Sequence, residues 1–389
     1  MSDRIVRFPP ALRPSGAANH ANLHRQVRRR PSPGAHAALA LASGSHYGER
    51  MATTAPGPPP VIDSPPRDVE AMLAALRAGL DDPHAGVPPK RPGNLLIGTW
   101  NVRAFGGITQ KWTSGQDDSP KRNLADVCAI AEVVSRFDVT AIQETRENLL
   151  GLRTMMSRLG EDWSFIVTDV GDGGPANGER LAFVHQRSRV KSSGLAGELV
   201  FPQEWFGDVD RGKLERQFAR TPYAVSFAAG DEAFTLVTLH VLFGDSPEDR
   251  TPELAAIAHW LGERAHKGGD FNHNMLALGD FNIDRQDDPN WIAFTENGKG
   301  LTPPPELNFL SRTIFDDEKK ESTFFDQIAW FTREGREQLT LRYNGSAGRF
   351  KWTDYWLRDM PKTPKSWRLS DHYPLWCEFE LGARRRFRR

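Results

Sequence analysis

The stretch LLIGTWNV (residues 95–102) is a continuous apolar run that ends at a polar residue, Asn101. Its length and hydrophobicity predict a buried β-strand. After a Gly-rich loop, apolar residues recur at helical spacing, which predicts a helix over about 120–136. Working outward from this unit, the chain repeats the same order of apolar strand and amphipathic helix.

Further apolar runs of strand length follow. They are VTAIQET (139–145), SFIVTDV (164–170), ERLAFVHQ (179–186), AVSFAAG (224–230), FTLVTLHVLF (234–243), MLALGDFN (275–282), QIAWF (327–331) and HYPLWCEFEL (372–381). Several are joined by short Gly-containing turns, which are typical of antiparallel neighbours. Helices are expected over about 152–159 and 251–266. The pattern predicts an α/β (α+β) four-layer sandwich, in which two mixed, mostly antiparallel β-sheets pack face to face with helices outside.

The ends of the chain differ from this central part. Residues 1–93 are rich in Pro, Ala and Arg and have little apolar periodicity. We expect them to be largely disordered, apart from a short helix near 68–80 that docks on the domain. The predicted organisation is therefore this N-terminal segment, one folded domain over 94–382, and a basic tail over 383–389.

Composition excludes several protein classes. The chain has 389 residues, 50 basic and 50 acidic, and two cysteines. Two cysteines cannot form a disulfide framework or a cysteine-based zinc site, so we expect a reducing, cytoplasmic location. The export-like stretch after Arg28-Arg29-Arg30 is a weak match, and a translation start at Met51 is an alternative interpretation. No apolar run approaches the ~20 residues of a membrane span, so we expect no membrane insertion. No feature implies an obligate protein partner.

Polar side chains interrupt the predicted strands near their ends. They are Asn101, Glu144, His240, Asp280, Asn282, Asp326, Asp371 and His372. Buried carboxylates and imidazoles are costly unless they are paired or bind a metal, so we expect these residues to converge on one site. Carboxylate and amide oxygens suit Mg²⁺, Mn²⁺ or Ca²⁺. Together with two histidines for acid/base chemistry, such a cation is suited to hydrolysing phosphate esters.

Eight short motifs occur in a fixed order over about three quarters of the chain. They are GTWNVR, AIQETR, GERLAF, FARTPYAVSF, TLHV, LGDFN, FDQIAW and SDHYPL. This order resembles the endonuclease/exonuclease/phosphatase superfamily. The segments WNVRAFG, QETRENL and FDQI, and the histidine of TLH, are most similar to deoxyribonuclease I-like members.

The resemblance implies a role for each motif residue. Asn101 and Glu144 would hold the divalent metal, with Asp371 nearby. Asp280 and Asn282 would orient the attacking water and the scissile phosphate. His372 would pair with Asp326, and His240 would pair with Glu179 and protonate the leaving oxygen. A final group, Arg103, Arg146 and Arg220, would face phosphates of a nucleic-acid substrate.

Other features leave alternatives open. Asn177 stands where deoxyribonuclease I-like members have a minor-groove Tyr, which weakens the case for duplex DNA. Trp352, Tyr355, Trp356 and Trp367 are interleaved with Lys and Arg, so they could stack single-stranded bases or be ordinary core and rim residues of a lid. Besides a DNA endonuclease, we consider a phosphomonoesterase, a lipid or small-molecule phosphodiesterase, and an inactive binding module.

The zero net charge is a cancellation. Residues 1–93 hold 12 basic and 7 acidic residues, and the tail holds five arginines. Residues 94–382 hold 33 basic and 43 acidic residues, a net charge of −10. A domain of this charge is expected to bind DNA weakly when binding does not depend on sequence. Long-range attraction of DNA would therefore come from the two basic ends.

Overall fold

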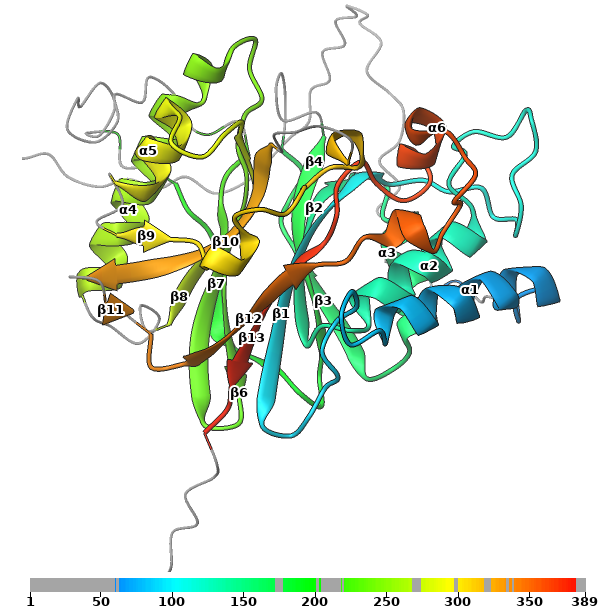
Figure 1. The fold of residues 1–389 in the computed structure, drawn as a ribbon, viewed down its shortest axis with the longest axis horizontal. Helices are drawn as coiled ribbons and strands as arrows, with labels where there is room; N and C mark the ends of the chain where they lie inside the picture. The colour runs from blue at the N-terminus through cyan, green and yellow to red at the C-terminus, as the bar shows by residue number, and fades with distance from the viewer. Residues whose placement is uncertain are drawn as a thin grey trace, which may run out of the picture. The chain divides into compact units, whose positions relative to one another are not determined.

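Two β-sheets face each other, and helices cover their outer sides (Figure 1). The computed structural model divides the chain into two units, Met1–Pro56 and Gly57–Arg389, and every residue it describes belongs to the second. The described residues are 60, 63–171, 178–200, 203, 218, 220–267, 274–296, 300–317, 323–333, 336–337 and 339–382. The predicted sandwich of two mixed sheets is confirmed.

The first sheet has six strands in the order β12-β13-β1-β2-β4-β3. Their bounds are β1 (Asn94–Phe105), β2 (Val139–Arg146), β3 (Trp163–Val167), β4 (Glu179–Gln186), β12 (Arg342–Arg349) and β13 (Leu375–Glu380). Only β1 and β2 are parallel among the described pairings of this sheet.

The second sheet has seven strands in the order β11-β10-β8-β7-β6-β5, with β9 paired to β10. Their bounds are β5 (Lys191–Glu198), β6 (Tyr223–Ala229), β7 (Glu232–His240), β8 (Met275–Ile283), β9 (Leu301–Thr302), β10 (Phe324–Arg333) and β11 (Arg336–Glu337). Here the parallel pair is β7 with β8, and the other described pairings are antiparallel. Gly230 at φ +60° makes the tight turn between β6 and β7.

Helices form the two outer layers. The first sheet is covered by α1 (Arg67–Leu80), α2 (Leu124–Val134) and α3 (Leu150–Leu159), and the second by α4 (Thr251–Lys267) and α5 (Pro289–Thr295) (Figure 1). Shorter elements are η4 (Pro247–Asp249), η5 (Pro305–Leu307), η6 (Ile314–Asp316), η7 (Trp352–Asp354) and α6 (Lys362–Ser366). Helix α2 begins later than 120 because Asn123 and Asp126 form a capping box at its start.

The core has three parts that match these layers. Apolar side chains of both sheets fill the space between them, including Ile97, Phe183 and Leu278. A second cluster packs α1, α2 and α3 on the first sheet, and a third packs α4 and α5 on the second. Burial of these faces supplies most of the driving force for the sandwich.

Helix α1 belongs to the folded unit. Its apolar residues Val69, Leu73, Leu76 and Leu80 are all buried in the cluster that contains α2. The helix expected near 68–80 is therefore present and packs on the domain, where it covers apolar surface of α2 that would otherwise face water. The expected domain bounds, 94–382, stay a prediction.

Some predictions fall outside the described residues. They concern most of the N-terminal segment, including the export-like stretch and Met51, and also Asn177 and the basic tail. In the part that the structure describes, no helix combines the length and apolarity required to cross a membrane.

Candidate active site

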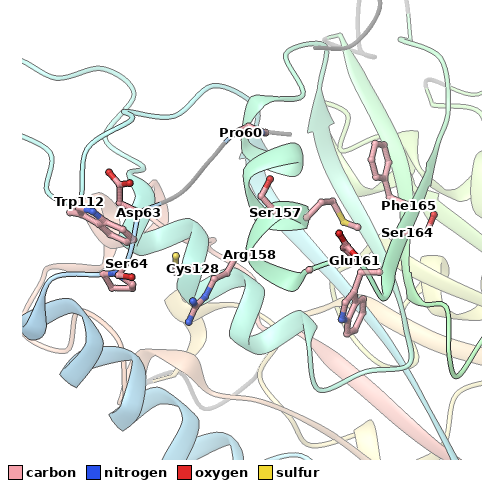
Figure 2. Close-up of a pocket in the computed structure, with 14 residues that line it drawn as sticks. Pro60, Asp63, Ser64, Trp112, Cys128, Ser157, Arg158, Glu161, Ser164 and Phe165 are labelled. Atoms are coloured by element: carbon pink, nitrogen blue, oxygen red, sulfur yellow. The ribbon is translucent and has the colours of Figure 1, made fainter. Parts of the chain in front are cut away.

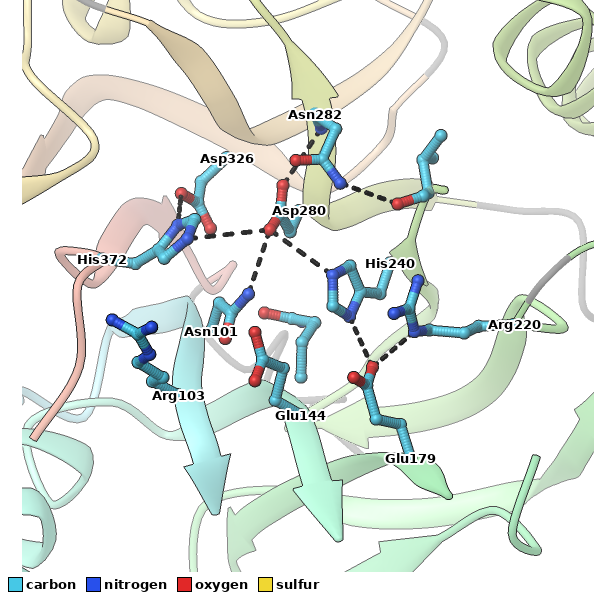
Figure 3. Close-up of polar contacts among 12 residues, drawn as sticks. Asn101, Arg103, Glu144, Glu179, Arg220, His240, Asp280, Asn282, Asp326 and His372 are labelled. Carbon is cyan, nitrogen blue, oxygen red and sulfur yellow. Dashed lines mark hydrogen bonds and ion pairs between the residues drawn. The ribbon is translucent and has the colours of Figure 1, made fainter. Parts of the chain in front are cut away.

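The two parallel strand pairs bring the predicted site residues to the same end of the sandwich. Asn101, near the end of β1, lies opposite Gln143 on β2. Glu144 is the residue after Gln143. In the second sheet, Asp280 lies opposite both His240 on β7 and Asp326 on β10. Parallel strands end at the same edge, so polar residues at their C-terminal ends meet there. Figure 3 shows this cluster.

Two residues of the cluster have left-handed backbone conformations. Glu144 has φ +58° and Asn282 has φ +51°. Non-glycine residues rarely adopt this conformation, which is costly and concentrates at functional sites. Next to them, a Cβ on Gly279 would lie 2.1 Å from the Leu239 carbonyl oxygen. The glycine of LGDFN therefore allows β8 to approach β7 beside the site.

His372 is paired with Asp326. Its Nδ1 lies 2.6 Å from Asp326 Oδ2, and its Nε2 lies 3.8 Å from Asp280 Oδ2 (Figure 3). Although burial opposes the charged imidazole, the adjacent Asp326 carboxylate raises the pKa of His372 well above its usual 6.5. The pair orients one ring nitrogen toward Asp280.

His240 forms the second pair, with Glu179. Its Nδ1 lies 3.0 Å from Glu179 Oε2, and its Nε2 lies 3.7 Å from Asp280 Oδ2. Burial opposes ionisation of Glu179, but His240 and Arg220 lower the pKa of this carboxyl. Both imidazoles thus face Asp280 Oδ2, and each contacts a second acidic residue through its other ring nitrogen (Figure 3).

Asp280 is held at the centre of the cluster. Its Oδ2 accepts a hydrogen bond from Asn101 Nδ2 at 3.0 Å, and its Oδ1 accepts one from the Asn282 backbone N–H at 3.0 Å. The Asn282 side chain donates to the Val241 carbonyl at 2.7 Å. Its predicted contact with a phosphate oxygen stays a prediction.

Asn101 and Glu144 have the properties of hard-cation ligands. Asn101 Oδ1 is buried and has no hydrogen-bond partner among the described residues. Although burial disfavours the charged form of Glu144, His240 and the Ala104 backbone N–H lower the pKa of this carboxyl to about 2. The site therefore offers one ionised carboxylate and one free amide oxygen, which suits a cation that keeps several waters.

Asp371 forms an ion pair with Arg103. Its Oδ2 lies 3.2 Å from Arg103 Nη1, whereas its Oδ1 is buried without a hydrogen-bond partner in the described part of the chain. No group of three or more His, Cys, Asp or Glu side chains among the described residues forms a ready-made metal cage.

The three arginines expected to face phosphates all pair with acidic residues of the site. Arg103 contacts Asp371, and Arg220 Nε contacts Glu179 Oε2. Arg146 Nη2 lies 3.5 Å from Glu144 Oε2 and 3.4 Å from Glu179 Oε1. These contacts orient the carboxylates, and the phosphate-binding role of the arginines stays a prediction.

Two supporting residues were not singled out from the sequence. Ser370 Oγ donates to the Asn101 carbonyl at 2.5 Å and accepts from the His372 N–H at 2.9 Å. Buried Arg122 donates to four backbone carbonyls, two after Asn101 on β1 and two just before Ser370. Ser370 could have been found from its place in SDHYPL, but Arg122 lies in no motif, and only tertiary contacts reveal its role.

The aromatic residues of the segment 343–367 have different environments. Trp352 and Trp356 are buried, so their suggested role in stacking bases is wrong. The Trp352 indole N–H instead donates to the His372 carbonyl at 3.1 Å, and the Trp356 indole N–H to Asp126 at 3.2 Å. They are core residues, and Trp367 alone of the four is exposed, to 48%.

A cavity of about 770 Å³ lies elsewhere, between α2, α3, β3 and the segment before α1 (Figure 2). Trp112, Trp163 and Phe165 line it together with Arg158 and Glu161. It shares no lining residue with the polar cluster. We therefore place the chemistry at the strand ends.

Comparison with known proteins identifies the family of this chain. Residues 98–359 match the model of the endonuclease/exonuclease/phosphatase family. A deoxyribonuclease from Thioalkalivibrio sp. (strain K90mix) is 24% identical over 307 residues, which are 76% of this chain and 73% of the relative.

Solved structures with a similar fold have lower identity. A family protein from Bacteroides thetaiotaomicron is 17% identical, with a TM-score of 0.49, over 76% of this chain and all of that one. The human Nocturnin catalytic domain is 14% identical, with a TM-score of 0.47, over 75% and 96% of the two chains. The family match covers well over half of the sequence, and the chain belongs to the endonuclease/exonuclease/phosphatase family, whose members are hydrolases of phosphate esters, as its ordered motifs predict.

Proposed function

We propose that the chain is a divalent-metal-dependent phosphodiesterase that hydrolyses nucleic-acid phosphodiester bonds, as a deoxyribonuclease I-like endonuclease. The observation that carries this proposal is the pair of imidazoles that face Asp280 Oδ2, at 3.8 Å from His372 and 3.7 Å from His240. Each imidazole is oriented by a carboxylate, so the site holds two acid/base groups on opposite sides of one oxygen. The deoxyribonuclease relative supports nucleic acid as the substrate class.

Asn101 and Glu144 would hold Mg²⁺ or Mn²⁺, with Ca²⁺ as a further candidate, and Asp371 would complete the site through its free oxygen. The bound cation would supply electrostatic stabilisation of the charge that develops on the phosphate. Glu144 is suited to this role because its low pKa keeps it ionised.

The acid/base steps belong to the chain's own residues. Asp280 is fixed by Asn101 and by the Asn282 backbone N–H, so its carboxylate can orient a water molecule for attack on phosphorus. The proton that this water releases can pass to the Asp280 carboxylate, which His372, held by Asp326, also faces. His240, held by Glu179, would protonate the leaving oxygen.

One observation favours a second candidate, an esterase of the same chemistry that acts on a smaller phosphomonoester, lipid or small-molecule diester. The net charge of −10 over residues 94–382 opposes tight association with a long polyanion. A bound cation would offset part of this charge, but most of it remains.

A plasmid-nicking assay with Mg²⁺, Mn²⁺, Ca²⁺ or EDTA tests the proposal, beside chromogenic phosphomonoester and phosphodiester substrates. We expect conversion of supercoiled to nicked plasmid in the presence of a cation, and no conversion in EDTA. Turnover of a monoester without cleavage of any nucleic acid would reject the nuclease and favour the second candidate. Equal nicking in EDTA would reject the metal dependence.

A further inference from the structure

Trp367 is an exposed aromatic side chain beside the catalytic cluster. It is 48% exposed, and it follows directly after α6. A large apolar ring in water loses the free energy that burial would give, about 25 cal/mol per Å² of apolar surface. Its exposure leaves part of the ring accessible to a ligand.

The ring is fixed in place through Arg103. The guanidinium carbon of Arg103 lies 3.9 Å from the Trp367 ring centroid. Arg103 also donates to Ser366 Oγ at 2.7 Å and pairs with Asp371 Oδ2 at 3.2 Å. The Arg103 guanidinium thus connects the indole to Asp371, a residue of the predicted metal site. The exposed ring therefore lies beside the place where a scissile phosphate would bind.

A second exposed ring lies on a segment joined to the same residue. The Ile314 backbone N–H donates to the Asp371 carbonyl at 2.8 Å, and the next residue, Phe315, is 38% exposed. Thr313, just before, forms a β-bridge with His372. Phe315 therefore lies one residue from a backbone contact to Asp371, on a segment that is far from Trp367 in the sequence.

We propose that Trp367 is a stacking platform for an unpaired base next to the scissile phosphodiester, so that single-stranded nucleic acid or an unpaired end is cleaved in preference to duplex. This inference rests on the proposed nuclease function. Every base has a flat face that an indole can cover, and such stacking contributes about 1–3 kcal/mol per base. Within a continuous duplex both faces of each base are covered by neighbours, and the ring would have no partner.

The electrostatics agree with a base rather than a second phosphate at this position. The charge of Arg103 is already engaged by Asp371, and the indole carries no charge. A substrate held partly by stacking also depends less on phosphate neutralisation, which fits a domain of net charge −10.

The test compares W367A, W367F and wild type on three substrates that carry the same fluorescent label. They are a single-stranded oligonucleotide, its duplex, and a single-stranded oligonucleotide with base-free sites at and beside the cleavage position. The readouts are KM and kcat with cation, and Kd from fluorescence anisotropy in EDTA. Ile292→Ala, which removes an exposed apolar side chain from α5, is the matched control.

For W367A we expect KM and Kd on the base-containing single strand to rise about 5- to 150-fold, the equivalent of 1–3 kcal/mol. W367F should restore most of the affinity, and the loss should shrink on the base-free oligonucleotide. Two results would overturn the inference: unchanged KM and Kd in W367A, or an equal loss of affinity for the base-containing and the base-free single strands. Trp367 would then only hold Arg103 in position. Failure of the wild type to cleave any oligonucleotide while it turns over a chromogenic ester would instead show that the proposed function is wrong.

Discussion

At the level of single residues, each imidazole of the site depends on one carboxylate for its orientation. Asp326 holds His372 Nδ1, and Glu179 holds His240 Nδ1, which leaves both Nε2 atoms facing Asp280. This arrangement fixes the orientation of each ring, because both of its nitrogens face carboxylate oxygens.

Replacement of either histidine should remove an acid/base group without unfolding the chain. We expect His240→Ala and His372→Ala each to lower kcat on an oligonucleotide by about 100-fold or more. His259→Ala on α4, outside the cluster, is the control. Steady-state kinetics together with circular dichroism measure the effect, and near-normal turnover in either variant would remove that histidine from the scheme.

Arg122 should affect both activity and stability. It is 3% exposed, and its guanidinium satisfies carbonyls on β1 and on the segment before Ser370. Arg122→Met removes these donors, which costs about 1–3 kcal/mol for each carbonyl left buried without a partner, and frees the segments that carry Asn101 and His372. The Ala104 carbonyl keeps a hydrogen bond from the Gly106 N–H.

Urea denaturation and kcat should therefore both change for Arg122→Met. The control is Arg136→Met, because Arg136 pairs with the exposed Asp81 and such surface pairs contribute at most about 1 kcal/mol. Equal stability of the two variants would contradict the role of Arg122.

At the level of elements, α1 completes the outer layer of the first sheet. Leu73 and Leu76 are fully buried against the cluster that contains α2. We expect Leu73→Ala to lower the free energy of unfolding by about 2–5 kcal/mol, through lost burial and a residual cavity. Ala78→Ser on the exposed face is the control in thermal unfolding. A melting temperature equal to that of the wild type would mean that α1 is only loosely attached.

The segment between α1 and β1 should confer a pH dependence on stability. Lys90 Nζ donates to Gln186 Oε1 at 2.7 Å, and burial lowers the Lys90 pKa from 10.5 to about 8, partly opposed by Asp138. The unfolded chain therefore binds more protons than the folded chain between pH 8 and 10.5. The Lys90 contribution to stability becomes more favourable as pH rises through this range.

A comparison with Lys90→Met isolates this contribution. The free energy of unfolding of wild type minus that of Lys90→Met should increase between pH 8 and 10.5, by up to about 3 kcal/mol. Urea denaturation of both proteins at several pH values gives this difference. A difference that stays constant with pH would contradict the lowered pKa.

At the level of the whole molecule, charge is unevenly distributed along the chain. Residues 1–59 hold eight basic and two acidic residues, and 383–389 hold five arginines, whereas residues 94–382 carry −10. If the substrate is nucleic acid, the two ends supply the long-range attraction.

Removal of residues 1–59 and 383–389 should reduce the dependence of Kd on salt concentration. Fluorescence anisotropy with a labelled oligonucleotide between 50 and 200 mM salt, on the order of physiological strength, measures the slope of log Kd against log salt. A full-length chain with the five tail arginines replaced by Gln serves as a separate control for the tail. An unchanged slope in the truncated chain would exclude the ends as contributors.

The sequence alone was sufficient to predict the family, the layered fold and most residues of the polar cluster at the strand ends. Apolar runs predict strands because burial on both faces requires continuous hydrophobicity, and polar residues at their ends reveal a site because burying them is costly. The ordered motifs identify the family. The periodicity of 68–80 predicts the helix α1, but the surface that it covers could not be predicted, because its partner α2 is distant in the sequence.

Only the tertiary structure decided which polar groups meet. Asn101 and Asp280 are 179 positions apart, and His372 and Asp326 are 46 apart, so their contacts depend on how the two sheets pack. The same packing buries Trp352 and Trp356 and pairs each predicted phosphate-binding arginine with a carboxylate. It also leaves Trp367 exposed against Arg103. Local sequence determines what a residue can do, whereas its partners and its access to water follow from chain segments that are brought together only by folding.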